Sequence, residues 1–159
     1  MAYFIGCGIV LKQDNKYILV QETRNEKAGL YNLPAGTLEL HEDFLQAVRR
    51  ETKEETGVDT ILEHFVGVYQ TVIASGSNVV FLIFSGSVPD NAVFHSEEHE
   101  AIQAFSYEEL IALDEAKRLR SPIVRKSVED YQKGQRLPLG TVQTWHIDSL
   151  PAITVEKGH

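Results

Sequence analysis

Apolar runs alternate with short polar breaks along the first third of the chain. Residues 3–12 and 17–22 are rich in aliphatic and aromatic side chains, and Asp14 and Asn15 stand between them as a turn signal. Two apolar runs around such a turn predict a β-hairpin. Residues 23–36 are mixed in character and are interrupted by Gly and Pro, so the pattern predicts a loop there.

A helical pattern follows in residues 43–56, which contain neither Gly nor Pro. Leu45, Val48 and Thr52 recur at helical spacing, which predicts a helix that docks on a sheet through one face. Gly57 comes directly afterwards, and glycine is the residue type that commonly ends a helix. The pattern therefore predicts one amphipathic helix with a glycine at its C-terminal boundary.

Strand-like patterns dominate the middle of the chain. Residues 58–72 and 78–88 are apolar runs, and the Ala-Ser-Gly-Ser sequence between them has hairpin potential. A further strand is expected at 101–106 and a short helix at 107–113. Strands mixed with a few helices predict a domain of the α/β or α+β class.

The last third begins with a helix start signal. Ser121 is suited to the N-cap position and Pro122 to the first helical position, and the helix is expected to run to about Lys133, ahead of a glycine. We expect one more strand over residues 142–147. Residues 150–159 are expected to be loose.

The composition is that of an ordinary globular domain. The 159 residues are 43% apolar and 24% charged, with no repeat, low-complexity tract or linker. We therefore assign residues 1–159 to a single domain. Cys7 is the only cysteine, which rules out an intrachain disulfide framework and a multi-cysteine metal cluster.

Charge narrows the class of partner. The chain has 23 Asp and Glu against 15 Lys and Arg, for a formal net charge of -8. Nucleic-acid polymers and anionic membranes attract basic surfaces, so neither is an expected partner, although a divalent cation can bridge an acidic protein to a small polyanion. No apolar run approaches the roughly 18 residues of a membrane span. The N-terminus lacks a basic leader, so we expect a cytoplasmic location.

Three glutamates in the predicted helix are the first candidates for chemistry. Each helical residue turns by about 100°, so Glu54 and Glu55 lie about 60° and 40° to either side of Glu51. Carboxylates this close repel one another and raise each other's pKa. A hard divalent cation removes the conflict, because Mg²⁺ binds carboxylate oxygens together with substrate phosphates. The spacing predicts a Mg²⁺ site.

Neighbouring residues fit the same site. Arg50 adjoins Glu51 and precedes Glu54 by four residues, and its planar guanidinium can hold a carboxylate in a fixed orientation. Glu42 stands at the start of the helix, where a negative charge suits the helix dipole. Gly36 lets the preceding loop approach the metal closely and offer a backbone carbonyl.

The segment from Gly36 to Val58, GTLELHEDFLQAVRRETKEETGV, resembles the Nudix box, the signature of the Nudix hydrolase family. The fixed positions of the box are all matched, by Gly36, Glu42, Arg50, Glu51, Glu54, Glu55 and Gly57. Thr52 departs from the pattern, because an apolar residue is expected after Arg-Glu. Its methyl group can still pack on a sheet.

A second resemblance is to the NudJ-type phosphatases, which are small bacterial members of the same family. The sequences LPAG before the box, LRSP at 119–122 and the later YQ, GQR and PL pairs carry it. The similarity spans about residues 3 to 140.

The resemblance implies a Nudix α/β/α sandwich, with a mixed sheet between helices, and cleavage of a nucleoside diphosphate linked to another moiety with Mg²⁺ or Mn²⁺. It implies that Glu51, Glu54 and Glu55 are metal ligands, with the carbonyl of Ala35 as a further one. It also implies that Arg50 orients Glu51. Gly36, Glu42 and Gly57 would be mainly structural.

The NudJ-type resemblance implies release of orthophosphate from nucleoside tri- and diphosphates and from hydroxymethylpyrimidine diphosphate. Two other functions stay open. One is a pyrophosphatase for ADP-ribose or another nucleotide conjugate, and the other is a Nudix-fold nucleotide-binding domain without turnover. Loss of the box carboxylates is expected of a non-catalytic domain, and this chain keeps them.

Hydrolysis also benefits from a general base. Glu51 is one candidate, and the loop at 95–100 supplies the others, Glu97, Glu98 and Glu100, among which we favour Glu98.

Cations, histidines and aromatic residues outside the box give weaker signals. Arg24 and Lys27, in the loop before the box, are candidates to bind distal phosphates. His95 and His99 are the only histidines with a ligand-like spacing, and so loose a pattern does not predict a histidine metal site. Arginines near the last helix are expected in structural ion pairs, and the aromatic side chains mainly in packing.

Overall fold

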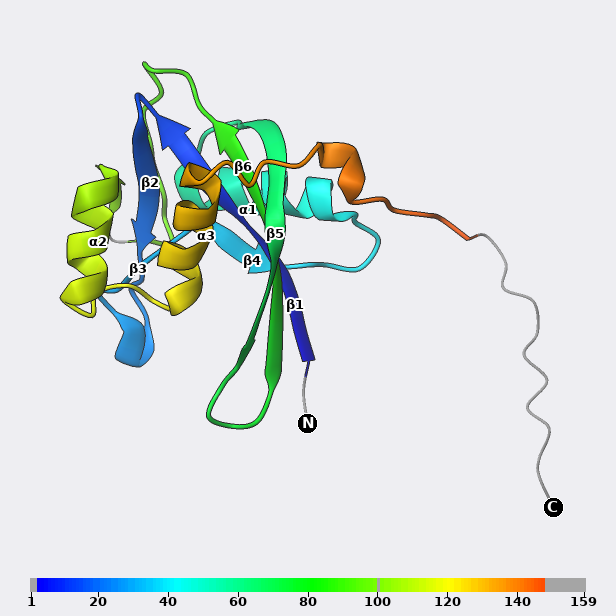
Figure 1. Cartoon of the computed structure of the whole chain (residues 1–159), viewed down its shortest axis with the longest axis horizontal. Coiled ribbons are helices and arrows are strands. Elements are labelled where there is room, and N and C mark those ends of the chain that lie inside the picture. Colours follow the sequence, from blue (N-terminus) through cyan, green and yellow to red (C-terminus); the bar gives the residue numbers. More distant parts are fainter. Residues whose placement is uncertain (1–2, 100, 148–159) are drawn as a thin grey trace.

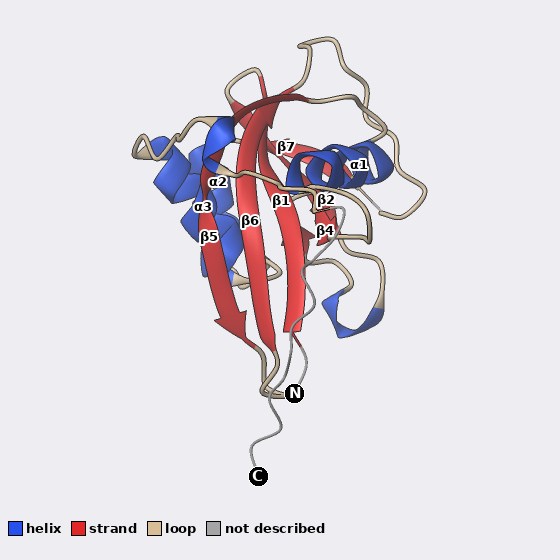
Figure 2. Cartoon of the chain, turned by 90° about the vertical axis from the view of Figure 1, so that its right-hand side faces the viewer, coloured by secondary structure: helices blue, strands red, loops and turns tan. Residues whose placement is uncertain are grey.

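The computed structural model describes residues 3–99 and 101–147. A mixed sheet lies between α1 on one face and α2 and α3 on the other (Figures 1 and 2). The strands are β1 Tyr3–Gln13, β2 Lys16–Gln21, β3 Tyr31–Asn32, β4 Ala35–Thr37, β5 Ile61–Val72, β6 Asn78–Ser87 and β7 Ile102–Phe105. The helices are α1 Phe44–Thr56, α2 Tyr107–Glu115 and α3 Pro122–Gln132, with 3-10 turns at Asn25–Lys27 and Leu139–Thr141.

β1 is the central strand of the sheet. The main strand order is β3-β2-β1-β6-β5, with β4 paired to β1 and β7 paired to β2. The β1–β6 pair is parallel and all the other pairs are antiparallel. The sheet is therefore mixed, as the resemblance implied. Because β4 pairs with β1 at residues 35–37, the loop before α1 lies beside the centre of the sheet.

α1 begins and ends where the sequence predicts. Asp43 caps it, accepting a hydrogen bond from the amide of Gln46 while the Gln46 side chain accepts from the amide of Asp43. Gly57 ends it in the left-handed region, with φ of 75°. The departure from the box pattern at Thr52 is accommodated. Its side chain is fully buried, and its hydroxyl donates to the carbonyl of Val48 at 2.6 Å.

The sheet separates two apolar cores. Beneath α1, the buried side chains include Ile9, Val48 and Phe84, and Leu45 is partly buried against them. On the opposite face, α2 and α3 cover the second core. Each face of the sheet therefore packs against at least one helix, and each contact encloses an apolar core.

The region predicted as a loop at 23–36 contains more structure than expected. Residues 25–27 form a 3-10 turn, β3 pairs with β2, and β4 begins at Ala35. Tyr31 and Leu33 are buried in the core beneath α3. Strands of two or three residues are too short to show an alternating pattern, which is why the sequence did not predict them.

The strand expected at 142–147 does not form, so this prediction was wrong. The chain reaches the β5 edge at Leu137, where Phe65 and Leu137 exchange backbone hydrogen bonds of 2.9 Å. The 3-10 turn at 139–141 then directs the chain away from that edge. Trp145 and Ile147 are exposed, so burial of apolar surface does not hold this segment on the sheet. The expectation for residues 150–159 lies outside the described residues.

Two smaller differences concern the late helices. α2 is two residues longer than expected and ends at Glu115. Ser121 occupies the N-cap position of α3 and Pro122 the first helical position, but the Ser121 side chain makes no capping hydrogen bond.

Across residues 3–99 and 101–147, none of the helices has the length and apolar content needed to cross a lipid bilayer.

α3 is tied to the sheet by a hydrogen-bonded carboxylate. Asp130 accepts from the hydroxyl of Tyr69 on β5 at 2.8 Å and from Nζ of Lys126 at 2.7 Å. Burial acts to raise the pKa of Asp130, but these hydrogen bonds outweigh it and hold the pKa below its ordinary value. A carboxyl group with a lowered pKa in the folded state stabilises the fold when it is ionised.

We predict that Asp130→Asn lowers the free energy of unfolding at pH 7 by about 1–2 kcal/mol. Because the pKa is lower in the folded state, the contribution is complete above the unfolded pKa of about 3.9 and is lost as the pH falls through the folded pKa. Urea unfolding at pH 7 and at about pH 3 measures both effects. Asp59→Asn, at a side chain that is 91% exposed, is the matched control. A pH-independent difference would contradict the prediction.

Candidate active site

Three glutamates gather near the C-terminal end of α1. The side chains of Glu51 and Glu55 are 15% and 11% exposed, whereas that of Glu54 is 49% exposed. Two of the carboxylates are therefore covered by protein, and the third is at the surface. This difference decides which of them need partners inside the fold.

The guanidinium of Arg50 brings several of these carboxylates together. Its Nη1 donates to Glu51 at 2.8 Å and to Glu54 at 3.2 Å. Nε and Nη2 donate to the two oxygens of Glu42 at 3.0 and 2.7 Å, and Nη2 also donates to the carbonyl of Thr37 at 3.0 Å. One planar cation thus joins the helix to the loop that precedes it.

Glu42 is the fixed partner of Arg50. Its hydrogen bonds from Arg50 hold the pKa of this carboxyl below its usual range, and the amide of Glu39 donates to it at 2.7 Å. Glu42 therefore stays ionised at neutral pH and keeps the guanidinium in place. Arg50 can then present its remaining edge to Glu51 and Glu54.

Gly36 provides the space in which the Glu51 carboxylate lies. A Cβ atom on Gly36 would overlap the carboxyl carbon and both oxygens of Glu51. Gly36 is paired with Cys7 of the central strand, so its backbone has little freedom to move away. Any side chain at this position must displace Glu51.

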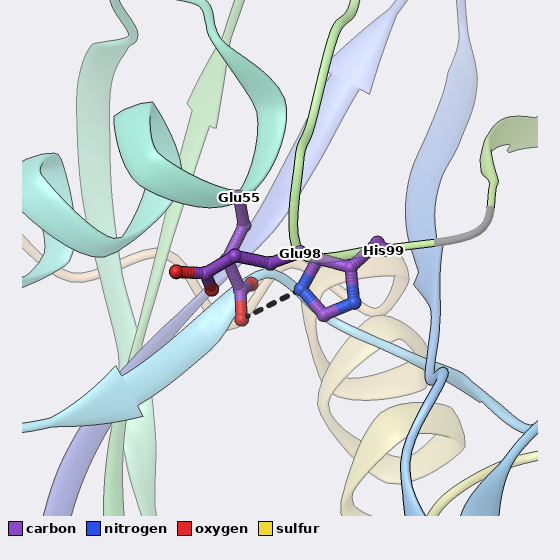
Figure 3. A group of neighbouring side chains, drawn as sticks. All are labelled: Glu55, Glu98 and His99. Atoms are coloured by element: carbon purple, nitrogen blue, oxygen red, sulfur yellow. Dashed lines mark ion pairs between the residues drawn. The ribbon is translucent and has the colours of Figure 1, made fainter.

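Glu55 is held by two separate segments of the chain. Its Oε2 accepts a hydrogen bond of 2.9 Å from the amide of Ala35, and its Oε1 lies 3.1 Å from Nε2 of His99 (Figure 3). Burial raises the pKa of Glu55, while His99 and the Ala35 amide oppose that rise. The pKa of His99 is raised in turn, chiefly by its contact with Glu55.

The loop before β7 lies against the end of α1. The amide of His95 donates to the carbonyl of Thr56 at 2.9 Å, and a Cβ atom on Gly57 would stand 2.7 Å from the carbonyl oxygen of His95. Farther along, the hydroxyl of Thr23 donates to the carbonyl of Glu98 at 2.9 Å. Gly57 thus serves both the helix end and the close approach of the loop.

These contacts bring Glu98 to the acidic cluster. Ligand atoms of Glu55, Glu98 and His99 lie within 4.8 Å of one another, and Figure 3 shows the three side chains converging. Burial raises the pKa of Glu51, Arg50 opposes this rise, and the charges of Glu54 and Glu98 add to it.

The donor set fits a divalent cation. Four carboxylates of like charge converge, and burial and mutual repulsion raise the pKa of the covered ones, Glu51 and Glu55. Within the described part of the chain, Nε2 of His99 is buried beside them without an aligned hydrogen-bond partner. A cation with oxygen and nitrogen ligands would relieve both conflicts.

A pocket of about 450 Å³ meets this cluster at Ala35. It lies between β6 and the first turn of α3, and Phe81, Arg120 and Lys27 are among the residues that line it. Ala35 joins pocket and cluster, because it lines the pocket while its amide binds Glu55. A ligand in the pocket can therefore extend toward the carboxylates.

Some residues of the site were not expected from the sequence. His99 was not predicted to join the cluster, because its spacing from His95 is too loose a signal, although it follows Glu98 directly. Arg120 was expected in a structural ion pair, and it does lie 3.6 Å from Glu22, but it also lines the pocket. Lys27 and Arg24 are both exposed, but only Lys27 lines the pocket. Glu97 is exposed in the same loop, and Glu100 lies outside the described residues.

Comparisons with known proteins agree with this geometry. The sequence profile of the NUDIX domain matches residues 3–127. The chain is 35% identical over 134 residues to Phosphatase NudJ of Escherichia coli K12, a match that covers 82% of this chain and 84% of that protein. The chain belongs to the Nudix hydrolase family, and it is an enzyme that acts on acid anhydrides of phosphorus.

Solved structures confirm the fold. A NUDIX hydrolase from Nitrosomonas europaea is 34% identical, with a TM-score of 0.78 over 89% of this chain and 97% of that one. The E. coli dihydroneopterin triphosphate pyrophosphohydrolase is 18% identical, with a TM-score of 0.67 over 82% of this chain and 97% of that one. The second likeness concerns the fold alone. Both confirm the α/β class with a mixed sheet between helices.

We predict that Gly36→Ala lowers kcat by about 100-fold or more, because displacing a positioned catalytic carboxylate by about 1 Å has effects of this size. Steady-state kinetics measures the loss, and a thermal melt shows whether the variant is folded. Gly140→Ala is the matched control, since a Cβ atom there meets nothing within 4 Å. A folded Gly36→Ala protein with the activity of the Gly140→Ala control would refute the role of this contact.

Proposed function

We propose that the protein hydrolyses phosphoanhydride bonds in nucleoside tri- and diphosphates, or in a small-molecule diphosphate such as hydroxymethylpyrimidine diphosphate. The reaction depends on Mg²⁺ and releases orthophosphate. The observation that carries this proposal is the junction at Ala35 between the acidic cluster and the pocket. The name of the E. coli relative, Phosphatase NudJ, supports the release of orthophosphate.

The metal ion would be held by Glu51, Glu54 and Glu55 together with the carbonyl oxygen of Ala35. When bound, Mg²⁺ or Mn²⁺ supplies neutralisation of charge on the phosphoryl oxygens and makes water easier to deprotonate. Arg50 keeps the Glu51 and Glu54 carboxylates oriented through its 2.8 and 3.2 Å hydrogen bonds. Positioning and electrostatics of this kind account for most catalysis of phosphoryl transfer.

Glu98 accepts the proton of the attacking water in this proposal. It is exposed at the solvent side of the cluster, where water arrives, and the loop backbone that carries it is bonded to Thr23. Glu51 is the other candidate. One of its oxygens is already bonded to Arg50, and its carboxylate is packed against Gly36, so it is better suited to holding the metal.

The pocket supports a compact substrate. About 450 Å³ is in the lower half of the usual range for small-molecule sites, which suits one base or pyrimidine better than a dinucleotide conjugate. The ring of Phe81 offers a surface for that group, and Lys27 and Arg120 offer positive charge to the phosphate tail. Arg24, outside the lining, meets phosphate only from the solvent side.

Other partners do not enter the proposal. A net charge of -8 disfavours a nucleic-acid polymer or an anionic membrane as the ligand. The cytoplasmic location stays a prediction from the sequence. The sequence does not indicate an oligomeric state.

A product assay tests the proposal. We expect repeated turnover with Mg²⁺ on nucleoside di- and triphosphates or hydroxymethylpyrimidine diphosphate, with orthophosphate as the product. Excess EDTA should abolish turnover, and added Mg²⁺ or Mn²⁺ should restore it, because the carboxylates need the cation to bind phosphate. A nucleoside monophosphate and a second phosphorylated fragment from ADP-ribose would instead establish a pyrophosphatase. Binding without turnover would establish a nucleotide-binding domain.

We further predict that Glu98→Gln lowers kcat by about 10²- to 10⁴-fold, because loss of a general base has effects of this size. Glu97→Gln is the matched control, since Glu97 is the exposed neighbour in the same loop. If Glu98→Gln keeps its rate and Glu51→Gln loses it, Glu51 is the base.

A further inference from the structure

His99 is a buried histidine that the proposed reaction leaves without a role. Its side chain is 7% exposed, and it lies between the end of α1 and the backbone of β2. Nδ1 is 3.2 Å from the carbonyl oxygen of Gln21. A carbonyl oxygen only accepts hydrogen bonds, so Nδ1 carries the hydrogen and Nε2 is the atom turned toward Glu55.

Nε2 is in ion-pair contact with Glu55 but lacks an aligned hydrogen bond. It lies 3.1 Å from Oε1 of Glu55, but it makes no aligned hydrogen bond with any residue in the described part of the chain. A buried ring nitrogen in this condition costs free energy, and such atoms in native proteins usually have a partner. Either a proton on Nε2, paired with Glu55, or a metal ion between Nε2 and the carboxylates would supply it.

The surrounding oxygens are arranged for a metal ion. Oε2 of Glu55 is occupied by the Ala35 amide, which leaves Oε1 directed toward His99. Glu98 brings a third ligand atom within 4.8 Å of the other two (Figure 3). Adjacent ligands of an octahedral ion with bonds near 2.1 Å are about 3 Å apart, which is the spacing of Nε2 and Oε1.

We propose that His99 is a metal ligand, binding through Nε2 an ion that Glu55 and Glu98 also hold, and that this nitrogen makes the site prefer Mn²⁺ to Mg²⁺. The inference rests on the proposed function, because it concerns the same acidic cluster. One oxygen of Glu98 binds the ion, and the other remains available to the water.

The partner of Nδ1 is the one that metal-binding histidines commonly have. Such histidines donate their second ring N–H to a backbone carbonyl or a carboxylate, which fixes the tautomer and the orientation of the ring. Imidazole nitrogen suits transition metals, whereas Mg²⁺ prefers a shell of oxygens. Replacing one oxygen by Nε2 therefore favours Mn²⁺.

Electron paramagnetic resonance of bound Mn²⁺ tests the proposal directly. Pulsed spectra of the wild-type protein should show coupling to a directly bound ¹⁴N nucleus, and His99→Gln and His99→Ala should lack it. Titration of free Mn²⁺ should show about a 10-fold or greater loss of affinity in both variants. Competition with Mg²⁺ should show that Mg²⁺ affinity changes by less than about threefold, so the Mn²⁺ preference falls.

His95→Ala is the matched control, because His95 is exposed in the same loop and contacts α1 through its backbone amide. It should keep both the ¹⁴N coupling and the Mn²⁺ affinity. Thermal melts without metal identify any variant that fails to fold, and His99→Gln, which keeps most of the side-chain volume, guards against that outcome. The ¹⁴N coupling in the wild-type protein tests the proposal even if every His99 variant fails to fold.

The outcomes separate this inference from the proposed function. Tightly bound Mn²⁺ without ¹⁴N coupling in a wild-type protein that releases orthophosphate would overturn the histidine ligand and leave the function intact. ¹⁴N coupling that His99→Gln abolishes, in a protein without turnover, would support the ligand and overturn the function. Equal loss of Mn²⁺ and Mg²⁺ affinity in His99→Gln would overturn the proposed metal preference.

Discussion

The site depends on one cation, the guanidinium of Arg50, which holds mutually repelling carboxylates in one place. Three glutamates within the end of one helix repel one another, and burial of Glu51 and Glu55 adds a desolvation cost. Arg50 binds Glu51, Glu54 and Glu42 at once and also reaches the carbonyl of Thr37. The acidic cluster can therefore exist before any metal arrives, and its orientation is set by the fold.

The fold supports that cluster from several directions. Gly36 of β4 makes room for Glu51, and the Ala35 amide fixes one oxygen of Glu55. The loop before β7 reaches the cluster because Gly57 tolerates its backbone at close range. As a result, a strand, a helix end and a distant loop meet at the cluster, and Ala35 connects the cluster to a pocket of about 450 Å³ that Lys27 and Arg120 help to line.

Local patterns predicted local structure well. The bounds of α1 followed from Asp43, Gly57 and the apolar face, and both hairpins followed from their turns. The strand expected at 142–147 did not form, because the pairing with β5 stops at Leu137 and Trp145 and Ile147 stay exposed. The short strands β3 and β4 were missed because they are defined by their partners in β2 and β1, and two or three residues have no period of their own.

The sequence by itself determined the family resemblance, the acidic face of α1 and the residues able to hold a cation, because helical spacing places i, i+3 and i+4 together wherever the helix lies. Only the tertiary structure decided which distant groups join them. His99 and Arg120 were not expected at the site, yet one reaches Glu55 and the other lines the pocket. Their positions depend on how loops pack against the sheet. The spacing of residues in the sequence does not predict such contacts between distant segments.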